Sequence, residues 1–469
     1  MKKWLAWIMV LAMACSMSAC AGTDSSDSSI HSSGLDDSST VSLSSEDSSS
    51  LEESSLSSEE ISLEESVIES SSESMEDSII SEEESSSSSV EESSSEDSQT
   101  SEEEEELRVY DEFNLETYLS PYWDNTVMYN ETVMFVGAND EAPLLYAPTE
   151  IVSVRNYGLN IEYVEGVDYV VENGKIKRTA NSSIPYFEVG DYYLSSPDSV
   201  AIKVVNSKAD TPLTGTKYLK YGEGDTFTKN QIAVTYRHKG TWQGSVPQGK
   251  SARLQHALTK IKTGDELNVV YYGDSIMTGC NASSTSAGGN VSPYTPPFAN
   301  MINEYLENKY GCFIYSYNSA VAGWTTAQGL EAVQSRVVDR NPDLVVLGFG
   351  MNDMSTSLAD YKSMMKSMIE QVRAGNENAN VILVATTVPN YESDWYGNQE
   401  LYVDVLLELE AEYDFVAVAD MTTMHKDLFA QGKRFRDVTG NNINHPNDFV
   451  VRAYAQVILQ TLLGEDFTV

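Results

Sequence analysis

The segment LNVVYYGDSI, residues 267–276, is the strongest indication of the fold that we expect for the C-terminal half of the chain. Its first six residues are mostly β-branched or aromatic, which is typical of a buried strand. The Gly-Asp-Ser that follows is the kind of polar run that ends a parallel strand, and open α/β sheets bind ligands at those ends. Ser275 is therefore a candidate nucleophile, although Gly, Asp and Ser are also common in turns.

Three further polar positions strengthen this interpretation. Gly323 follows the apolar strand predicted at residues 312–317, Asn352 follows the strand predicted at 343–347, and His445 precedes the last predicted helix. Acyl transfer needs a hydroxyl that attacks, an imidazole that takes its proton, and donors for the developing oxyanion. A backbone N–H beside a glycine and an asparagine amide both supply such donors, so the sequence predicts one site for acyl transfer.

The ordered blocks Gly273-Asp274-Ser275, Gly323, Gly350-Met351-Asn352-Asp353 and His445 resemble the SGNH, or GDSL-type, hydrolase family. The resemblance extends over residues 265–465. It implies a serine esterase in which Ser275 is the nucleophile and His445 is the general base that later serves as acid. It also implies an oxyanion hole formed by the N–H groups of Ser275 and Gly323 and the side chain of Asn352.

One position departs from the family pattern. The family places an aspartate three residues before its histidine, and this sequence has Asn442 there. A neutral amide oxygen accepts an imidazole N–H and orients the ring, but it brings no negative charge to the imidazolium. We therefore expect His445 to be oriented by Asn442 or by a backbone carbonyl, or to be paired with an acid from elsewhere. Asp437 and Asp448 are the acids nearest in sequence.

Residues 1–20 have the layout of a secretory signal, with two lysines, a short apolar run and small residues before Cys20. The apolar run is too short for a transmembrane helix. Ala19-Cys20 resembles the lipobox of bacterial lipoproteins, which implies lipidation of Cys20, with Cys15 as a second candidate and a plain secretion signal as the alternative. We expect an extracellular protein that a lipid on Cys20 anchors to the membrane at the cell surface.

Residues 21–106 have a different composition, dominated by Ser, Glu and Asp. They contain 28 of the 72 acidic residues of the chain and no Lys or Arg. Such a segment cannot bury enough apolar surface to offset its chain entropy, so we predict a disordered linker. Its function is either that of a stalk that extends the catalytic part from the membrane, or only that of a solubilising tail.

The remaining chain divides into two predicted domains. Residues 107–250 show short strands separated by turns, which favours an all-β sandwich or jelly-roll-like module. Residues 251–469 alternate strands with helices, which predicts a parallel sheet covered on both faces, a three-layer flavodoxin-like α/β domain. The α/β-hydrolase fold is excluded because Ser275 lacks the Gly-x-Ser-x-Gly elbow.

The other histidines and the cysteines give little support to alternative chemistry. His31, His238, His256 and His425 lie away from the motif positions, and His425 falls on a predicted surface helix. Cys280 and Cys312 either form a disulfide or pack as free thiols. We expect no metal and no nucleotide cofactor, because the sequence has neither a zinc-ligand spacing nor a phosphate loop. The acidic composition argues against nucleic acid as a partner.

The predicted substrate rests on a family resemblance. An extracellular SGNH domain with a β module and a stalk resembles carbohydrate O-acetyl esterases, which implies acetylated polysaccharide as substrate. Trp395 and Tyr396, in a loop after a predicted strand, and Trp324, beside Gly323, are candidates for stacking on sugar or for capping the sheet. Two alternatives remain open, a lysophospholipase or other lipid esterase and a non-catalytic surface protein that binds polysaccharide.

Overall fold

The computed structural model describes residues 107–198, 201–204 and 215–469. The predicted signal with Cys15 and Cys20, the predicted linker of residues 21–106 and His31 lie outside the described residues. Within the described ranges, no helix is both long enough and apolar enough to cross a membrane.

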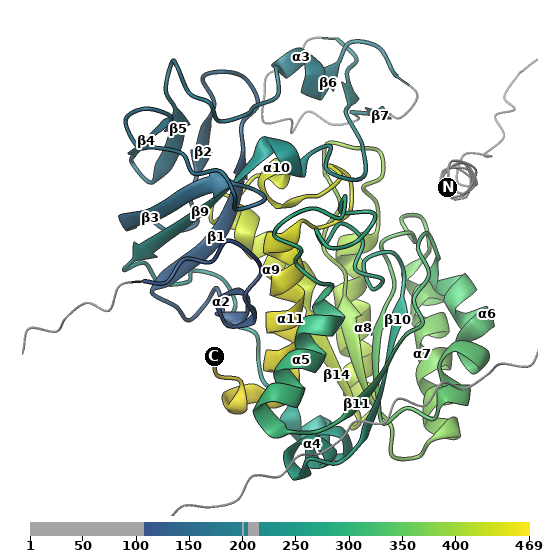
Figure 1. The fold of residues 1–469 in the computed structure, drawn as a ribbon. Coiled ribbons are helices and arrows are strands. Elements are labelled where there is room, and N and C mark those ends of the chain that lie inside the picture. The colour runs from purple at the N-terminus through teal and green to yellow at the C-terminus, as the bar shows by residue number, and fades with distance from the viewer. Residues whose placement is uncertain (1–106, 199–200, 205–214) are drawn as a thin grey trace, which may run out of the picture. The chain divides into compact units, whose positions relative to one another are not determined.

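A five-stranded parallel sheet forms the centre of the C-terminal part (Figure 1). Its strands follow the order β11-β10-β12-β13-β14, which is the flavodoxin-like order. The predicted parallel sheet is therefore confirmed. The strands are β10 (Leu267–Gly273), β11 (Ile314–Asn318), β12 (Leu344–Gly348), β13 (Asn380–Ala385) and β14 (Val416–Asp420).

Helices cover both faces of this sheet, as the alternating pattern predicts. Alternate side chains of a strand point to opposite faces, so Tyr271 packs in one hydrophobic cluster and Tyr272 in another. The cluster around Tyr271 includes residues of α4 (Gln255–Thr263), α5 (Phe298–Tyr310), α9 (Met421–Ala430) and α11 (Asp448–Leu463). The cluster around Tyr272 includes residues of α6 (Thr326–Arg336), α7 (Leu358–Gly375) and α8 (Tyr402–Glu412).

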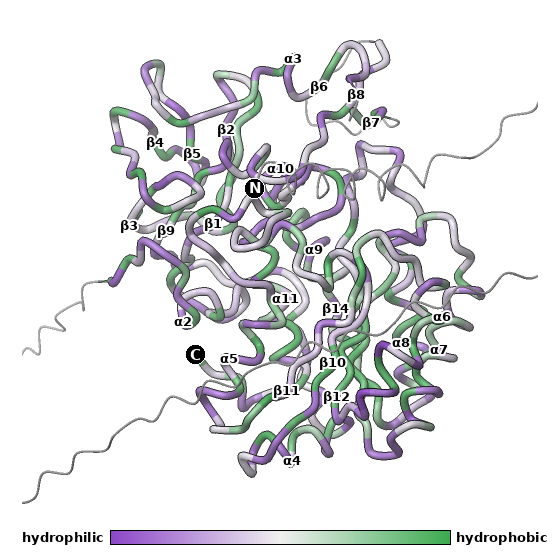
Figure 2. The backbone as a smooth tube through the Cα atoms, turned by 45° about the vertical axis from the view of Figure 1, so that its right-hand side comes forward, coloured by the Kyte–Doolittle hydropathy of each residue, from purple (hydrophilic) through white to green (hydrophobic). Residues whose placement is uncertain are grey.

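The strands of the sheet are continuously apolar because both faces are covered. Every residue of β12 and of β13 is buried, and Figure 2 shows how hydrophobic residues gather in this part of the chain. Short 3₁₀ turns occur at Thr228–Asn230, Ser251–Arg253, Val338–Arg340, Gln399–Leu401 and Gly464–Asp466.

The N-terminal part consists of antiparallel strands, which confirms the predicted β region. Three small sheets have the orders β1-β9-β3, β2-β5-β4 and β6-β8-β7. The strands are β1 (Val127–Met134), β2 (Glu141–Pro143), β3 (Pro148–Asn156), β4 (Tyr169–Glu172), β5 (Lys175–Arg178), β6 (Tyr193–Leu194), β7 (Ile202–Lys203), β8 (Tyr218–Leu219) and β9 (Gln231–His238). Two short helices, α2 (Leu115–Leu119) and α3 (Val189–Tyr192), complete this part.

Helix α11 lies between the antiparallel strands and the parallel sheet, and it contacts α2, β1 and β14 (Figure 1). Every residue of α11 except Gln460 is therefore buried. Arg452 lies inside this interface, where its Nε donates to the hydroxyl of Tyr122 at 2.8 Å. One hydrophobic cluster runs through both parts of the chain.

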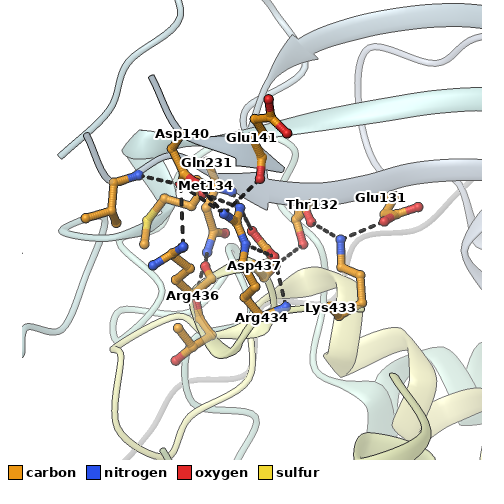
Figure 3. A network of polar contacts seen from close by, with 12 residues as sticks. Glu131, Thr132, Met134, Asp140, Glu141, Gln231, Lys433, Arg434, Arg436 and Asp437 are labelled. Carbon is orange, nitrogen blue, oxygen red and sulfur yellow. Dashed lines mark hydrogen bonds and ion pairs between the residues drawn. The ribbon is translucent and has the colours of Figure 1, made fainter. Parts of the chain in front are cut away.

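A network of buried charges joins β1 to the short helix α10 (Phe435–Val438) (Figure 3). The carboxylate of Asp437 accepts the N–H of Met134 at 2.9 Å and pairs with Arg434 at 2.8 Å. Arg434 also pairs with Asp140 at 2.9 Å. Burial alone would raise the pKa of Asp437, but the charges of Arg434 and Lys433 outweigh it and lower this pKa to about 2.

Lys433 and Glu131 form a second ion pair in this network, at 2.6 Å, with both side chains fully buried. Glu131 also accepts the N–H of Leu145 at 2.9 Å and the hydroxyl of Tyr236 at 2.6 Å. The ammonium of Lys433 also donates to the carbonyl of Thr132 at 2.8 Å. The charges are thus paired and hydrogen-bonded, which is what makes their burial tolerable.

The structure also shows the surroundings of His425 and the state of the two cysteines, Cys280 and Cys312. The predicted surface helix around His425 is α9, which has exposed residues such as Lys426, but the side of α9 that packs against the parallel sheet carries His425 and buries it to 3% exposure. Cys280 and Cys312 are both free thiols and form no disulfide. Cys312 is buried and its sulfur donates to the carbonyl of Leu306 at 3.6 Å, which fits the packing alternative.

Breaking the Lys433–Glu131 pair tests the role of the buried charges. We expect Glu131→Gln to lower the free energy of unfolding by about 3–5 kcal/mol, because the ammonium of Lys433 stays buried without its counter-charge. Urea unfolding of the full chain measures this. Glu412→Gln is the matched control, since Glu412 pairs with Lys362 and Lys366 on the surface, and it should unfold at the parent's urea concentration. Equal midpoints for both variants would contradict the prediction.

Candidate active site

Ser275 follows the end of β10, at a point where two strands approach closely. Gly273 is paired with Gly348 at the end of β12. A Cβ atom on Gly273 would lie 1.9 Å from the carbonyl oxygen of Gly348, so no larger residue fits there. The chain turns after this pair, and Ser275 is left 4% exposed at the carboxyl end of the sheet.

Asp274 fixes this turn. Its carboxylate accepts the N–H of Ile276 at 3.0 Å and the N–H of Met351 at 3.3 Å. Burial raises the pKa of Asp274 to about 7, despite the two backbone hydrogen bonds, which lower it. The side chain therefore connects the Ser275 turn to the Gly350-Met351-Asn352-Asp353 block.

His445 lies against Ser275. Its Nε2 is 2.9 Å from the Ser275 Oγ, and its Nδ1 is 2.7 Å from the Oδ1 of Asn281. The amide of Asn281 has a defined orientation, because its Nδ2 donates to the carbonyl of Ala287 at 3.1 Å. Since Oδ1 only accepts, Nδ1 carries the proton, and Nε2 is free to accept the hydroxyl proton of Ser275. This is the tautomer that a general base needs.

The loop that carries His445 is fixed by Asn441. The Oδ1 of Asn441 accepts the N–H groups of Ile443, Asn444 and His445, each at 3.0 Å. The N–H of Gly440 donates to the carbonyl of His445 at 2.9 Å, which closes the loop. The position of the imidazole thus rests on a compact set of side-chain-to-backbone hydrogen bonds.

The prediction that Asn442 orients His445 is wrong. Asn442 is fully buried and has a left-handed backbone, with φ of 73°. Its Oδ1 accepts the hydroxyl of Tyr192 at 2.7 Å, and its Nδ2 donates to the carbonyl of Lys220 at 2.9 Å. Because both ends of the amide bind the N-terminal part, Asn442 anchors the loop and does not contact the ring.

The two alternative acids also lie elsewhere. Asp437 belongs to the buried charge network, and Asp448 accepts the N–H of Ser283 at 2.9 Å. The acid near the ring is Glu223, whose Oε1 lies 3.4 Å from Nδ1 of His445. Sequence reasoning missed both Glu223 and Asn281. Glu223 lies in a Gly-Glu-Gly-Asp turn of the N-terminal part, which the sequence marks only as a break between strands.

The predicted oxyanion donors come from the ends of three neighbouring strands. The N–H of Val321 donates to the carbonyl of Gly273 at 2.9 Å, which places the Gly323 loop beside the Ser275 turn. Gly323 has φ of 81°, and a Cβ there would meet nothing within 4 Å, so the backbone conformation is what favours glycine. Within the described ranges, the N–H groups of Ser275 and Gly323 have no protein acceptor.

Asn352 joins the third strand end to this group. Its Nδ2 donates to the carbonyl of Trp324 at 3.0 Å, which brings the amide next to the Gly323 loop. Asp353 accepts the N–H of Thr326 at 3.1 Å and so fixes the start of α6 against the same block. The structure thus brings Ser275, Gly323, Asn352 and His445 to one edge of the sheet.

Residues 271–451 match the model of the GDSL-like lipase/acylhydrolase family. This part of the chain is a GDSL-like lipase/acylhydrolase domain. The match covers the turn of Ser275, the two loops with the predicted donors and the loop of His445. No curated protein matches the chain.

Several solved structures are similar to part of the chain. A two-domain esterase active on acetylated mannans, co-crystallised with mannopentaose, is 22% identical with a TM-score of 0.37, over 45% of this chain and 53% of that protein. The chain thus spans about half the length of that esterase. A catalytic mutant of an acetylxylan esterase from Geobacillus stearothermophilus is 17% identical with a TM-score of 0.35, over 42% of this chain and 95% of that protein.

The three aromatic residues predicted to stack on sugar are all partly buried at the GDSL domain's surface. Trp324 has the guanidinium of Arg336 over its ring at 4.7 Å. Trp395 packs against a hydrophobic cluster that includes Ile443 from the His445 loop. The hydroxyl of Tyr396 donates to Glu400. These contacts explain how the rings are held, and their binding of sugar stays a prediction.

Removing the Asn352 amide tests its predicted role as an oxyanion donor. We expect Asn352→Ala to lower kcat for nitrophenyl acetate by about 10²–10³-fold, the usual loss for one donor of this kind. Asn303→Ala is the matched control, since the Asn303 amide bonds Tyr271 and Ser316 away from the site. Thermal unfolding of both variants checks the fold. A parental kcat in Asn352→Ala would contradict the prediction.

Proposed function

We propose that this protein is a serine esterase that removes short acyl groups, above all acetyl, from the hydroxyl groups of carbohydrate. The observation that carries the proposal is the hydrogen bond of 2.9 Å between Ser275 Oγ and His445 Nε2, in a ring whose Nδ1–H is held by Asn281. A nucleophile, a base and an orienting group in contact are what covalent acyl transfer requires.

In the first half of the proposed reaction, the Oγ of Ser275 attacks the carbonyl carbon of the ester and its proton moves to Nε2 of His445. The carbonyl oxygen becomes an oxyanion, which the N–H groups of Ser275 and Gly323 and the amide of Asn352 stabilise. The bond between the carbonyl carbon and the sugar oxygen then breaks. The sugar oxygen takes the proton from Nε2 and leaves as a hydroxyl, and the acyl group stays on Ser275.

In the second half, water replaces the sugar. The oxygen of the water attacks the acyl carbon while His445 Nε2 takes a proton from that water. The donors that stabilise the first oxyanion also stabilise the second one. When the bond to Oγ breaks, the proton on Nε2 returns to Ser275 and the carboxylic acid leaves. His445 therefore acts as base and acid once in each half.

The surface of the site favours a short acyl group on a polar alcohol. None of the large hydrophobic side chains exposed in the described residues belongs to the segments 274–281, 319–324, 349–353 and 439–446 that form the site. A lipid esterase would need apolar surface there for a long chain. Glu223, Asn352 and Asn444, in or beside the segments that form the site, are at least partly exposed, and these polar groups suit a sugar. We further propose that the protein acts outside the cytoplasm, with Cys20 as its lipid anchor.

Hydrolysis by the full chain tests this function. We expect cleavage of nitrophenyl acetate and acetate release from acetylated xylan, little cleavage of long-chain nitrophenyl esters, and loss of all these activities in Ser275→Ala, which has no nucleophile. Ser153→Ala, a buried serine of β3, is the control and should keep parental activity.

Three results would count against the proposal. Preference for long acyl chains would favour a lipid esterase, and binding of polysaccharide without hydrolysis of any ester would favour a surface binding protein. Activity that survives in Ser275→Ala would show that another residue is the nucleophile.

A further inference from the structure

A polar cluster joins the N-terminal β part to the loop of His445, and the turn at residues 221–225 lies at its centre. The N–H of Gly224 donates to the carbonyl of Ala287 at 2.8 Å, and the N–H of Gly222 donates to the carbonyl of Asn441 at 3.5 Å. The turn is thus attached to the GDSL domain on both sides of Glu223. The carboxylate of Glu223 accepts the hydroxyl of Tyr221 at 2.6 Å and the Nδ2 of Asn441 at 3.0 Å.

We propose that Glu223, supplied by the N-terminal β part, is the anionic positioning partner of His445. Together with Asn281, it would replace the aspartate that the family places three residues before its histidine. The proposal rests on the proposed esterase function of Ser275. It gives the N-terminal β part a place in the active site itself, in addition to any binding of polysaccharide.

Asn281 and Glu223 lie at different distances from Nδ1 of His445, and these distances indicate different roles. Nδ1 has a single proton, and Asn281 Oδ1 accepts it at 2.7 Å. Glu223 Oε1 lies at 3.4 Å from the same nitrogen, which is within ion-pair distance but is long for a hydrogen bond. Asn281 therefore fixes the tautomer and the ring orientation, while Glu223 supplies the negative charge that a neutral amide lacks.

This charge acts when Ser275 loses its proton. As Nε2 takes the proton, the ring becomes an imidazolium, and an anion close to Nδ1 stabilises it in the transition state. Partial burial alone would raise the pKa of Glu223, but the charge of the protonated His445 ring and the hydrogen bonds from Tyr221 and Asn441 outweigh it and lower this pKa to about 2. Glu223 is thus an anion throughout and takes no proton from the ring.

The other ionisable groups near the ring do not supply this charge. Burial raises the pKa of Asp274 to about 7, and its carboxylate is engaged by two backbone N–H groups. Burial also raises the pKa of the Cys280 thiol to about 11 and raises the pKa of Tyr221 further still, so both are neutral. In the part of the chain that the structure describes, Glu223 is the acid within ion-pair distance of His445.

The test compares Glu223→Gln with the parent in two reactions followed against pH. One is hydrolysis of nitrophenyl acetate, and the other is labelling of Ser275 by a fluorophosphonate, which forms an oxygen–phosphorus bond as fluoride leaves and needs no natural substrate. We expect both rates at neutral pH to fall about 10–100-fold, less than the 10⁴-fold loss when tautomer and charge are both disturbed. The acid limb of both profiles should move to lower pH, because an imidazolium without its anion loses its proton more easily.

Three further variants separate charge from structure. Asp225→Asn removes a charge from the same turn at an exposed side chain that pairs with Lys229, and it should leave both profiles unchanged. Glu223→Asp should retain the position of the acid limb. The double variant Glu223→Gln with Asn281→Asp places the negative charge on the side chain that accepts the Nδ1–H of His445. It should recover at least part of the rate that Glu223→Gln loses.

The outcomes are distinguishable from failure of the proposed function. If Glu223→Gln keeps rates within twofold of the parent, or if it lowers the thermal midpoint and the rate without moving the acid limb, Glu223 has no electrostatic role and the inference is overturned. If the parent cleaves no ester while the labelling profile still shifts in Glu223→Gln, the esterase function fails and the pairing of Glu223 with His445 stands.

Discussion

The position of His445 depends on the attachment of an irregular loop to strands that precede it by a long stretch of sequence. A loop has no ladder of backbone hydrogen bonds to fix it, so other bonds must do so. The loop starts directly after α10, and Asp437 of α10 binds the backbone of β1 and the guanidinium of Arg434. Gln231 of β9 donates to the carbonyl of Arg436 (Figure 3). Gln231 also donates to the carbonyl of Thr439, at the junction of α10 and the loop. These contacts place the imidazole over the end of β10.

The buried charges at this junction contribute more to the specific alignment of the two parts than to the free energy of folding. A buried ion pair gains little over an apolar contact of the same size, because desolvation offsets much of the attraction. A buried charge without its partner is strongly unfavourable, however, so Lys433 and Glu131 are compatible with only one alignment of β1 and the segment before α10. We interpret the network as the feature that fixes how the antiparallel strands meet the GDSL domain. Asn442 reinforces this alignment through its bonds to Tyr192 and Lys220.

The site itself combines two kinds of support. Ser275, Gly323 and Asn352 follow three neighbouring strands of the parallel sheet, so the rigid sheet positions the proposed nucleophile and the predicted oxyanion donors. The groups that act on Nδ1 of His445 come from loops, and one of them, Glu223, belongs to the N-terminal part. The antiparallel strands are packed onto the same domain as the site, since α11 lies between them and the sheet.

The pattern of residues along the chain was enough to predict the parallel sheet, the helices on its faces and the order of the candidate site residues. Continuous apolar strands alternating with helices allow only a sheet covered on both sides, and strand ends of such a sheet meet at one edge, so Ser275, Gly323 and Asn352 were predictable. The groups that hold Nδ1 of His445 could not be predicted in this way. The family pattern, which has an aspartate three residues before the histidine, pointed to Asn442. The left-handed backbone of Asn442 and its bonds to the N-terminal part keep its amide away from the ring. Asn281 and Glu223 reach the ring through side-chain contacts between distant loops, and such contacts depend on tertiary packing and leave no periodic pattern in the chain.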